Sequence, residues 1–156
     1  MRIVPKKNYF ILLLLSLVVI VLTLFLRSFY NNNLRPTSDI YNYAKIIKSD
    51  QLDLYLDENP STIIYISDKY NLDNADLEEE LKQKIISLNL YDNFVYLDKS
   101  ELSDKIVLHF NDEYQTDFSL DKMPALIIIN DKKVIFSYYS LTKDTLNNID
   151  LGDVKW

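Results

Sequence analysis

Residues 123–139 constrain the fold of this chain more than any other segment. They comprise Met123, Pro124, a run of five apolar residues, a polar turn and a second run rich in β-branched and aromatic residues. An apolar run of this length between turn residues is typical of a strand buried on both faces. Pro124 fits only the first residue of such a strand, because proline cannot donate to the ladder. Residues 130–133 accept tight-turn geometry, so the segment predicts a β-hairpin.

Charge is divided unevenly along the 156 residues. Residues 1–35 hold five of the 17 Lys and Arg residues and none of the 23 Asp and Glu residues. The rest of the chain therefore has 12 basic against 23 acidic residues, a formal charge of −11. A segment this acidic suits nucleic acid poorly, because phosphate charge dominates affinity there. We expect no nucleic-acid partner.

Cysteine is absent from the sequence, and glycine occurs once, at Gly152. Without cysteine there is no disulfide, no thiol nucleophile and no thiolate metal site. With a single glycine, no glycine-rich phosphate loop can form. These two counts exclude thiol chemistry and the common nucleotide-binding motifs.

An uncharged apolar run occupies residues 10–26. Its 17 residues contain no Gly or Pro, and as a helix they would reach about 25 Å, near the lower limit for crossing a bilayer. A cleaved signal peptide would have a shorter apolar stretch followed by small residues, whereas the first alanine here is Ala44. A buried core helix would be amphipathic or flanked by domain sequence, and this run is neither. We therefore predict an uncleaved transmembrane anchor, so the membrane is an expected partner.

Basic residues lie on both sides of this run. Arg2, Lys6 and Lys7 precede it, and Arg27 and Arg35 follow it. The positive-inside rule favours a cytoplasmic N-terminus. The expected organisation is a cytoplasmic basic head at 1–9, the anchor at 10–26, a linker at 27–40 and an extracytoplasmic domain at 41–156. The expected location is the cell membrane, crossed once.

Strand and helix signals alternate from Tyr41 onward. Residues 41–47 suit a strand or a helical turn, and we favour a short strand. Residues 61–67 and 93–97 have the β-branched and aromatic content of strands. With the hairpin, these segments give five expected strands.

Four helices are expected between and after the strands, because apolar residues recur there at helical spacing. The first helix ends at Asn59, before Pro60. The expected caps are Ser49 or Asp50, Asp73 or Asn74, Ser100, and Thr142. The expected inward residues are Leu52, Tyr55 and Leu56; Leu77, Leu81, Ile85 and Leu88; Leu102, Ile106 and His109 or Phe110; and Leu146 and Ile149.

This order of elements predicts an α/β fold, in which a mixed sheet has helices on both faces. Over residues 41–150 the order and the hairpin resemble the thioredoxin fold. In that family the matching proline is cis and lies opposite the redox motif. The resemblance therefore implies a cis bond between Met123 and Pro124.

The sequence is similar to membrane-anchored or secreted thioredoxin-like proteins of Gram-positive bacteria, which include bacteriocin-transport accessory proteins. Those proteins have a form like Y-I-G-x-x-x-C-x-x-C after the second strand. With this form aligned on Tyr65, Ile66 and Ser67, the two cysteine positions fall on Asn71 and Asn74. The resemblance therefore implies a thioredoxin-like protein that lacks the redox motif.

No catalytic set can be assembled from the sequence. A thioredoxin-type enzyme needs a low-pKa thiolate and a second thiol, so thiol–disulfide exchange is excluded. His109, the only histidine, lies in an apolar helical segment, where a packed or half-exposed ring is the ordinary role. The acidic residues at 73–80 lack the glycine and the spacing of a calcium loop, and acids at a helix start need no metal. We expect no enzyme activity, no metal and no cofactor.

A groove beside the expected cis-proline is the remaining candidate site. In redox-active relatives, the loop before this proline offers main-chain groups to an extended substrate segment. Pairing of that kind needs no cysteine. The alternative is that the proline persists only because the fold requires its turn. The candidate peptide-binding residues are Tyr70, Asn71, Leu72, Asp73, Asn74, Met123 and Pro124.

Two classes of function follow. The first is a membrane-tethered, redox-inactive thioredoxin-like module that binds another protein or peptide at the outer membrane face as an accessory factor. The second is an extracytoplasmic enzyme with non-thiol chemistry, for example metal-assisted through the acidic helix start. The first needs only the features present, whereas the second needs a constellation that the sequence does not show.

Overall fold

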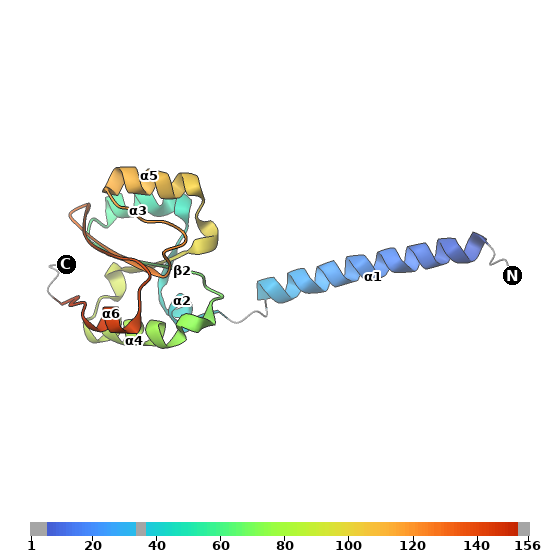
Figure 1. Ribbon diagram of the computed structural model, residues 1–156, viewed down its shortest axis with the longest axis horizontal. Helices are drawn as coiled ribbons and strands as arrows, with labels where there is room; N and C mark the ends of the chain where they lie inside the picture. The colour runs from blue at the N-terminus through green and yellow to red at the C-terminus, as the bar shows by residue number, and fades with distance from the viewer. Residues whose placement is uncertain (1–5, 34–36, 153–156) are drawn as a thin grey trace. The chain divides into compact units, whose positions relative to one another are not determined.

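The computed structural model describes residues 6–33 and 37–152, which belong to two compact units, 1–36 and 37–156. The first is a single helix, α1, over Lys6–Asn33 (Figure 1). It contains Ile11–Tyr30, a stretch of 20 residues whose side chains are all exposed. Of the helices in the described ranges, α1 is the one that is long and apolar enough to cross a membrane.

The described part of the segment predicted as a linker, residues 27–40, is largely helical. α1 continues to Asn33, because the chain has no glycine or proline between Lys6 and Arg35. A further helix, α2 over Asp39–Tyr43, begins within the same segment. The Ser38 side chain caps α2 by accepting a hydrogen bond from Tyr41 N.

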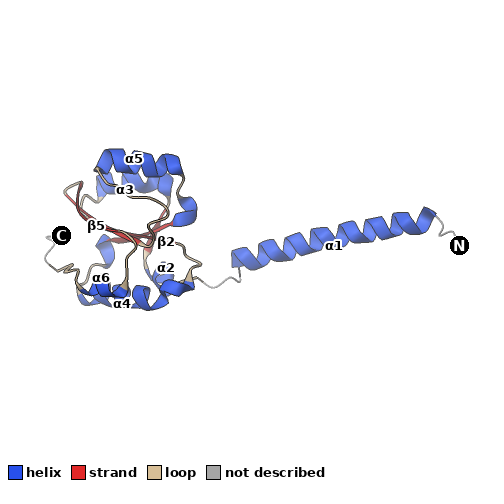
Figure 2. Ribbon diagram, viewed as in Figure 1, coloured by secondary structure: helices blue, strands red, loops and turns tan. Residues whose placement is uncertain are grey.

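The second unit is a five-stranded mixed sheet with helices on both faces, as predicted (Figures 1 and 2). The strand order is β1-β3-β2-β4-β5. β1, β3 and β2 run parallel, β4 is antiparallel to β2, and β5 is antiparallel to β4. The strands are β1 Lys45–Ile47, β2 Thr62–Ser67, β3 Phe94–Asp98, β4 Ala125–Asn130 and β5 Lys133–Tyr138. The helices are α2, α3 Leu52–Glu58, α4 Ala75–Ser87, α5 Asp104–Tyr114 and α6 Lys143–Asn147.

The hairpin predicted at residues 123–139 is confirmed. β4 is buried on both faces up to Asn130, and it pairs with β5 across a two-residue turn. The turn residues Asp131 and Lys132 have φ values of 54° and 61°, which match the positive φ values of a type I′ turn. The bond between Met123 and Pro124 is cis, as the resemblance implied.

Each face of the sheet is covered by its own apolar core. α2, α4 and α6 cover one face, and α3 and α5 cover the other (Figure 1). Successive strand residues point to opposite faces, so Ile63 and Tyr65 of β2 enter the first core, while Ile64 and Ile66 enter the second. The helix residues that were predicted to face inward and that lie in these cores are Leu52, Tyr55, Leu56, Leu77, Leu81, Ile85, Phe110, Leu146 and Ile149.

Several local predictions were wrong. Residues 41–47 contain the end of α2 as well as the short strand β1. Ser100 does not open a helix, because Asp98 caps a 3-10 turn there and α5 begins at Asp104 with Ser103 as its cap. The inward residues of α5 are therefore Val107 and Phe110.

The remaining differences concern helix ends. Leu88 lies beyond the last residue of α4 and is 41% exposed. The starts of α3 and α4 carry no side-chain cap, since each is preceded by a 3-10 turn. Thr142, by contrast, caps α6 as predicted.

Candidate functional site

A hollow of about 170 Å³ opens at the carboxyl ends of β2 and β3, beside the start of β4. Ser67 ends β2, Lys99 follows β3, and Pro124 precedes β4. Open α/β sheets commonly bind ligands at the carboxyl ends of their parallel strands. The hollow is lined by Ser67, Asp68, Asn71, Asn74, Lys99, Leu120, Asp121, Met123 and Pro124.

Four of the seven predicted site residues line this hollow. They are Asn71, Asn74, Met123 and Pro124, which come from two loops about fifty positions apart in the sequence. Tyr70, Leu72 and Asp73 belong to the first of these loops but do not line the hollow. The structure therefore brings together the cysteine-equivalent positions and the cis-proline.

Sequence reasoning missed the other lining residues. Asp68 and Lys99 follow different strands, and Leu120 and Asp121 come from the segment before β4. Only the sheet order places these segments side by side, because β3 and β4 are the two neighbours of β2. No linear motif marks them.

Met123 presents its main chain beside the hollow. The carbonyl of Lys122 accepts from Ser140 N at 2.9 Å, and the carbonyl of Pro124 accepts from Leu141 N at 2.8 Å. Met123 lies between these two residues in the sequence. Neither its N–H nor its C=O has a hydrogen-bond partner among the described residues. Met123 is also half-buried rather than enclosed. Its donor and acceptor are thus open to water or to a ligand.

The two asparagines differ in their surroundings. The Asn71 side-chain oxygen accepts from Asp73 N at 3.0 Å and caps the 3-10 turn before α4. Asn74 directly precedes α4 and makes no capping bond with its side chain. An amide does not attack a disulfide, so the hollow cannot carry out thiol exchange.

A carboxyl group is buried next to the hollow. Glu78 of α4 is 1% exposed, and its Oε1 accepts a hydrogen bond from the Tyr65 hydroxyl at 3.1 Å. Burial raises the pKa of Glu78, while the hydroxyls of Ser38, Tyr65 and Ser67 act in the opposite direction. Ser67 also lines the hollow, so Glu78 is one side chain away from it.

Glu78 was not identified from the sequence, where the acids at this helix start were treated as partners of the helix dipole. A signal was nevertheless present. Positions 78, 81 and 85 follow the spacing of one helix face, and Leu81 and Ile85 lie in the core.

An ion pair joins the loop before α4 to the end of β3. Lys69 Nζ lies 2.7 Å from Asp98 Oδ2, and the Asp98 side chain is buried. The hydrogen bond to Asp98 raises the pKa of Lys69. The Lys69 carbonyl also accepts from Ser38 N at 2.9 Å. These contacts fix the loop that carries Asn71 and Asn74.

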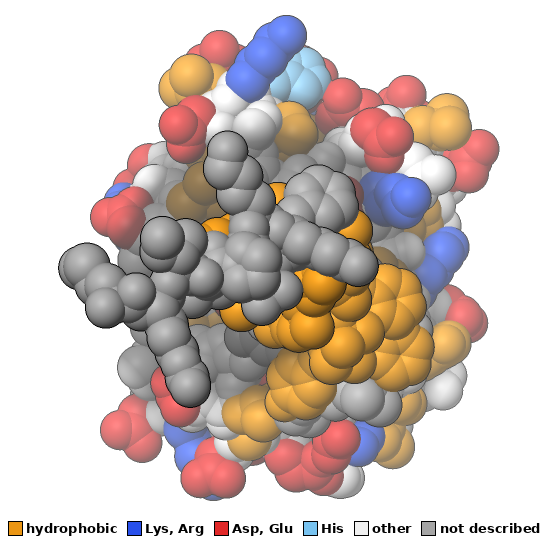
Figure 3. Space-filling model, turned by 90° about the vertical axis from the view of Figure 1, so that its right-hand side faces the viewer, with side chains coloured by type: hydrophobic (Ala, Val, Ile, Leu, Met, Phe, Trp, Pro, Cys, Tyr) orange, Lys and Arg blue, Asp and Glu red, His pale blue; other side chains and the backbone are white. Residues whose placement is uncertain are grey.

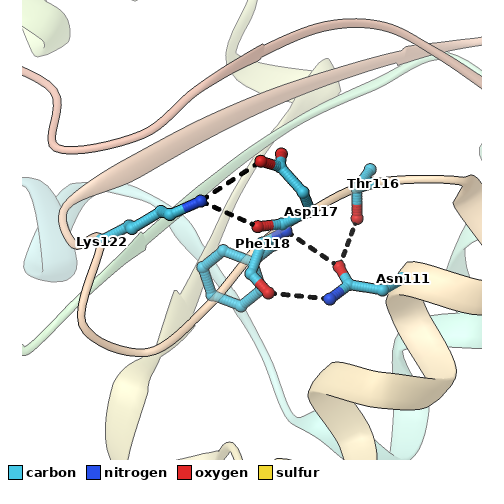
Figure 4. A network of polar contacts seen from close by, with 5 residues as sticks. All are labelled: Asn111, Thr116, Asp117, Phe118 and Lys122. Atoms are coloured by element: carbon cyan, nitrogen blue, oxygen red, sulfur yellow. Dashed lines mark hydrogen bonds and ion pairs between the residues drawn. The ribbon is translucent and has the colours of Figure 1, made fainter.

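The segment that leads to Met123 is fixed by the network in Figure 4. The Asn111 side chain on α5 donates to the Phe118 carbonyl at 2.8 Å and accepts from Phe118 N at 3.0 Å. It also accepts from the Thr116 hydroxyl. Lys122 Nζ contacts the carbonyl and the carboxylate of Asp117, at 3.3 and 3.2 Å. Both walls of the hollow are therefore held by side chains.

His109 is not part of this site. Its Nε2 lies 3.0 Å from Asp53 Oδ2, and both side chains are more than half exposed. The pair is a surface contact between α5 and α3. Across residues 6–33 and 37–152, no group of three or more His, Cys, Asp or Glu side chains is placed to hold a metal ion.

Comparison with known proteins identifies the fold. No protein-family model and no curated protein matches the sequence. Among solved structures, a chain described as a candidate oxidoreductase with a thioredoxin fold matches with a TM-score of 0.52 and 10% identity, over 70% of this chain and 95% of that chain. The domain has a thioredoxin-like fold.

A second similar chain comes from a structure that addresses thiol resolution in yeast mitochondrial 1-Cys peroxiredoxin by the glutathione and thioredoxin systems. It matches with a TM-score of 0.51 and 15% identity, over 69% of this chain and 93% of that chain. At such low identities these likenesses describe the fold and carry no activity over to this thioredoxin-like domain.

Proposed function

We propose that this chain is a membrane-tethered, redox-inactive thioredoxin-like module that binds an extended segment of another protein at the outer face of the cell membrane, as an accessory factor. The observation that carries the proposal is the free main-chain pair of Met123 beside the hollow. An extended segment pairs with one N–H and one C=O as a neighbouring strand would, while one of its side chains enters the hollow. Such binding needs no thiol.

The fixed walls of the hollow support binding. Asn111 and Lys122 hold the segment before β4, and Asp98 holds the loop before α4 through Lys69. A preformed site loses less conformational entropy when a ligand binds. A binding role without catalysis is also compatible with asparagine at positions 71 and 74, where thiol enzymes of this fold have cysteines.

The tether rests on α1. Its segment Ile11–Tyr30 has the length and composition of a membrane-spanning helix. The basic residues Arg2, Lys6 and Lys7 precede it, which favours a cytoplasmic N-terminus. The thioredoxin-like domain would then lie outside the cytoplasm.

A random peptide library, panned against the full-length chain in detergent micelles, tests the proposed binding. We expect enriched peptides whose affinity falls about tenfold or more in Asn74→Trp, because the indole fills the hollow. Leu108→Trp is the matched control, since it adds the same ring at an exposed position of α5 that does not line the hollow. Absence of enrichment, or equal binding by Asn74→Trp, would contradict the proposal.

Met123→Pro tests the main-chain contact itself. The substitution removes one N–H donor, and we expect a loss of about three- to tenfold in affinity for the same peptides. Thermal unfolding of the variant, followed by circular dichroism, shows whether the domain remains folded. Unchanged affinity in a folded variant would show that this donor does not contact the peptide.

A further inference from the structure

We infer that the hollow selects a lysine or arginine side chain of the bound segment. This inference rests on the proposed function and goes beyond it by naming the residue class that is recognised. The hollow is lined by two carboxylates, Asp68 and Asp121, and by one ammonium group, Lys99. None of the three takes part in an ion pair within the described part of the chain.

Asp121 is an exposed carboxylate at the rim. A hydrogen bond from the Ser119 side chain lowers its pKa, so it is ionised at neutral pH. Asp68 is held in place because its Oδ1 accepts from Tyr70 N at 2.9 Å. The carboxylates therefore occupy defined positions on the wall of the hollow.

Three positive contributions oppose these carboxylates. The start of α4 adds about half a positive charge from the helix dipole, and Lys99 adds one. Lys122 also attracts Asp121, but its charge is paired with that of Asp117. Asp76 in the first turn of α4 acts against the dipole. With Lys122 paired to Asp117, the two carboxylates outweigh Lys99 and the helix dipole. The chain after residue 35 has a formal charge of −11, and acidic side chains are visible around the edge of the face in Figure 3.

The Asn74 side chain also favours a lysine or arginine side chain as the ligand. Asn74 has no hydrogen bond from its side chain among the described residues, so its carbonyl oxygen can accept from an ammonium or guanidinium group. With Asp68 and Asp121, it offers acceptors on more than one side of the hollow. A long, straight side chain suits such a site, since its charged end can reach the acceptors while its stem contacts Leu120 and Met123.

Sequencing of the peptides enriched from the random library tests the inference. We expect Lys or Arg to be enriched at one fixed position, and the affinity for such peptides to fall about two- to fivefold in Asp121→Asn and in Asp68→Asn. Asp68→Asn keeps the oxygen that accepts from Tyr70 N. Asp112→Asn, an exposed change on α5 outside the lining, is the control with the same change in net charge.

Salt provides an independent measurement. Affinity for the Lys or Arg peptides should fall between about 50 mM and 500 mM salt, and it should fall less in Asp121→Asn than in Asp112→Asn. Enriched peptides without a basic position, or with an acidic one, would overturn this inference while leaving peptide binding intact. Failure to enrich any peptide would overturn both this inference and the proposed function.

Discussion

Glu78 has an environment that few carboxyl groups tolerate. It lies among Tyr65 and the hydroxyls of Ser38 and Ser67, and burial raises its pKa. A buried carboxyl favours its neutral form, because ionisation there costs far more than in water. The protonation of Glu78 is therefore coupled to the stability of the domain.

Glu78→Gln should stabilise the domain at neutral pH, by on the order of 1 kcal/mol. The folded pKa of Glu78 lies above its unfolded value, so its contribution is full below the unfolded pKa and is lost as pH rises through the folded pKa. Glutamine keeps the oxygen that accepts from Tyr65 and does not ionise. Urea unfolding of the full-length chain at a series of pH values measures the difference, which should shrink toward acidic pH.

Glu79→Gln is the control for that experiment. Glu79 is exposed, and hydrogen bonding from Gln83 followed by the charge of Lys82 lowers its pKa. Its small contribution therefore has the opposite sign and is lost as pH falls. A Glu78→Gln variant less stable than the original chain at neutral pH would show that the buried carboxylate is better satisfied than we infer.

Of the residues that line the hollow, four were predicted from the resemblance, and the others were identified only in the folded structure. Asn71 and Asn74 could be placed because they follow β2 at a fixed spacing. Lys99 and Asp121 could not be placed from the sequence. They line the hollow only because β3 and β4 pair with the two sides of β2. Pairing between strands is a property of the folded chain and has no short-range signal.

Among the secondary-structure elements, α5 ends in an unusual way. Gln115 follows it in the left-handed conformation, with φ 54° and ψ 45°, and its N–H donates to the Asn111 carbonyl. Glycine is the usual residue at such a position, because a Cβ atom disfavours it. The chain instead holds this end through the Asn111 side chain and the network of Figure 4.

Gln115→Gly should raise the free energy of unfolding by about 0.5–1 kcal/mol, because it removes the strain at a left-handed position. Glu113→Gly, two residues earlier and inside α5, should lower it by about 1 kcal/mol. Urea unfolding followed by circular dichroism compares the two variants. A destabilised Gln115→Gly chain would mean that the glutamine side chain contributes more than its conformation costs.

Asn111→Ala tests the segment between α5 and the hollow. The change removes a half-buried side chain that bonds both polar groups of Phe118, and we expect a loss of about 2 kcal/mol in stability. Peptide affinity should fall as well, because this segment leads to Met123. Hydrogen exchange across residues 115–123 would detect the loosening, and unchanged protection there would contradict this role.

The longer elements were predictable from the sequence and the short ones were not. α4 and the hairpin have strong periodicity or a continuous apolar run, and both were found. The part of α2 from Tyr41 to Tyr43 was assigned to a short strand in preference to a helical turn, because tyrosine favours strands locally. This helix depends on tertiary contacts, namely the full burial of Ile40 and the bond from Ser38 N to the Lys69 carbonyl.

For the molecule as a whole, the proposed topology places the acidic domain outside the cell. Protease added to intact protoplasts of a bacterial host should therefore digest the domain while a cytoplasmic marker protein survives. Before digestion the expressed chain should keep its mass of 18.4 kDa, because no A-x-A-like run of small residues follows the apolar run. A domain that is protected until the protoplasts are lysed would reverse the orientation, and a shortened chain would indicate a signal peptide.

Met123 contributes the only sulfur atom in the chain besides that of Met1. Oxidation of a methionine converts an apolar side chain into a polar sulfoxide, and the change can be reversed enzymatically. The half-buried Met123 side chain lines the hollow. This thioredoxin-like domain without thiols thus has one side chain that can be oxidised reversibly, and peroxide would alter it at the surface where we propose that the partner binds.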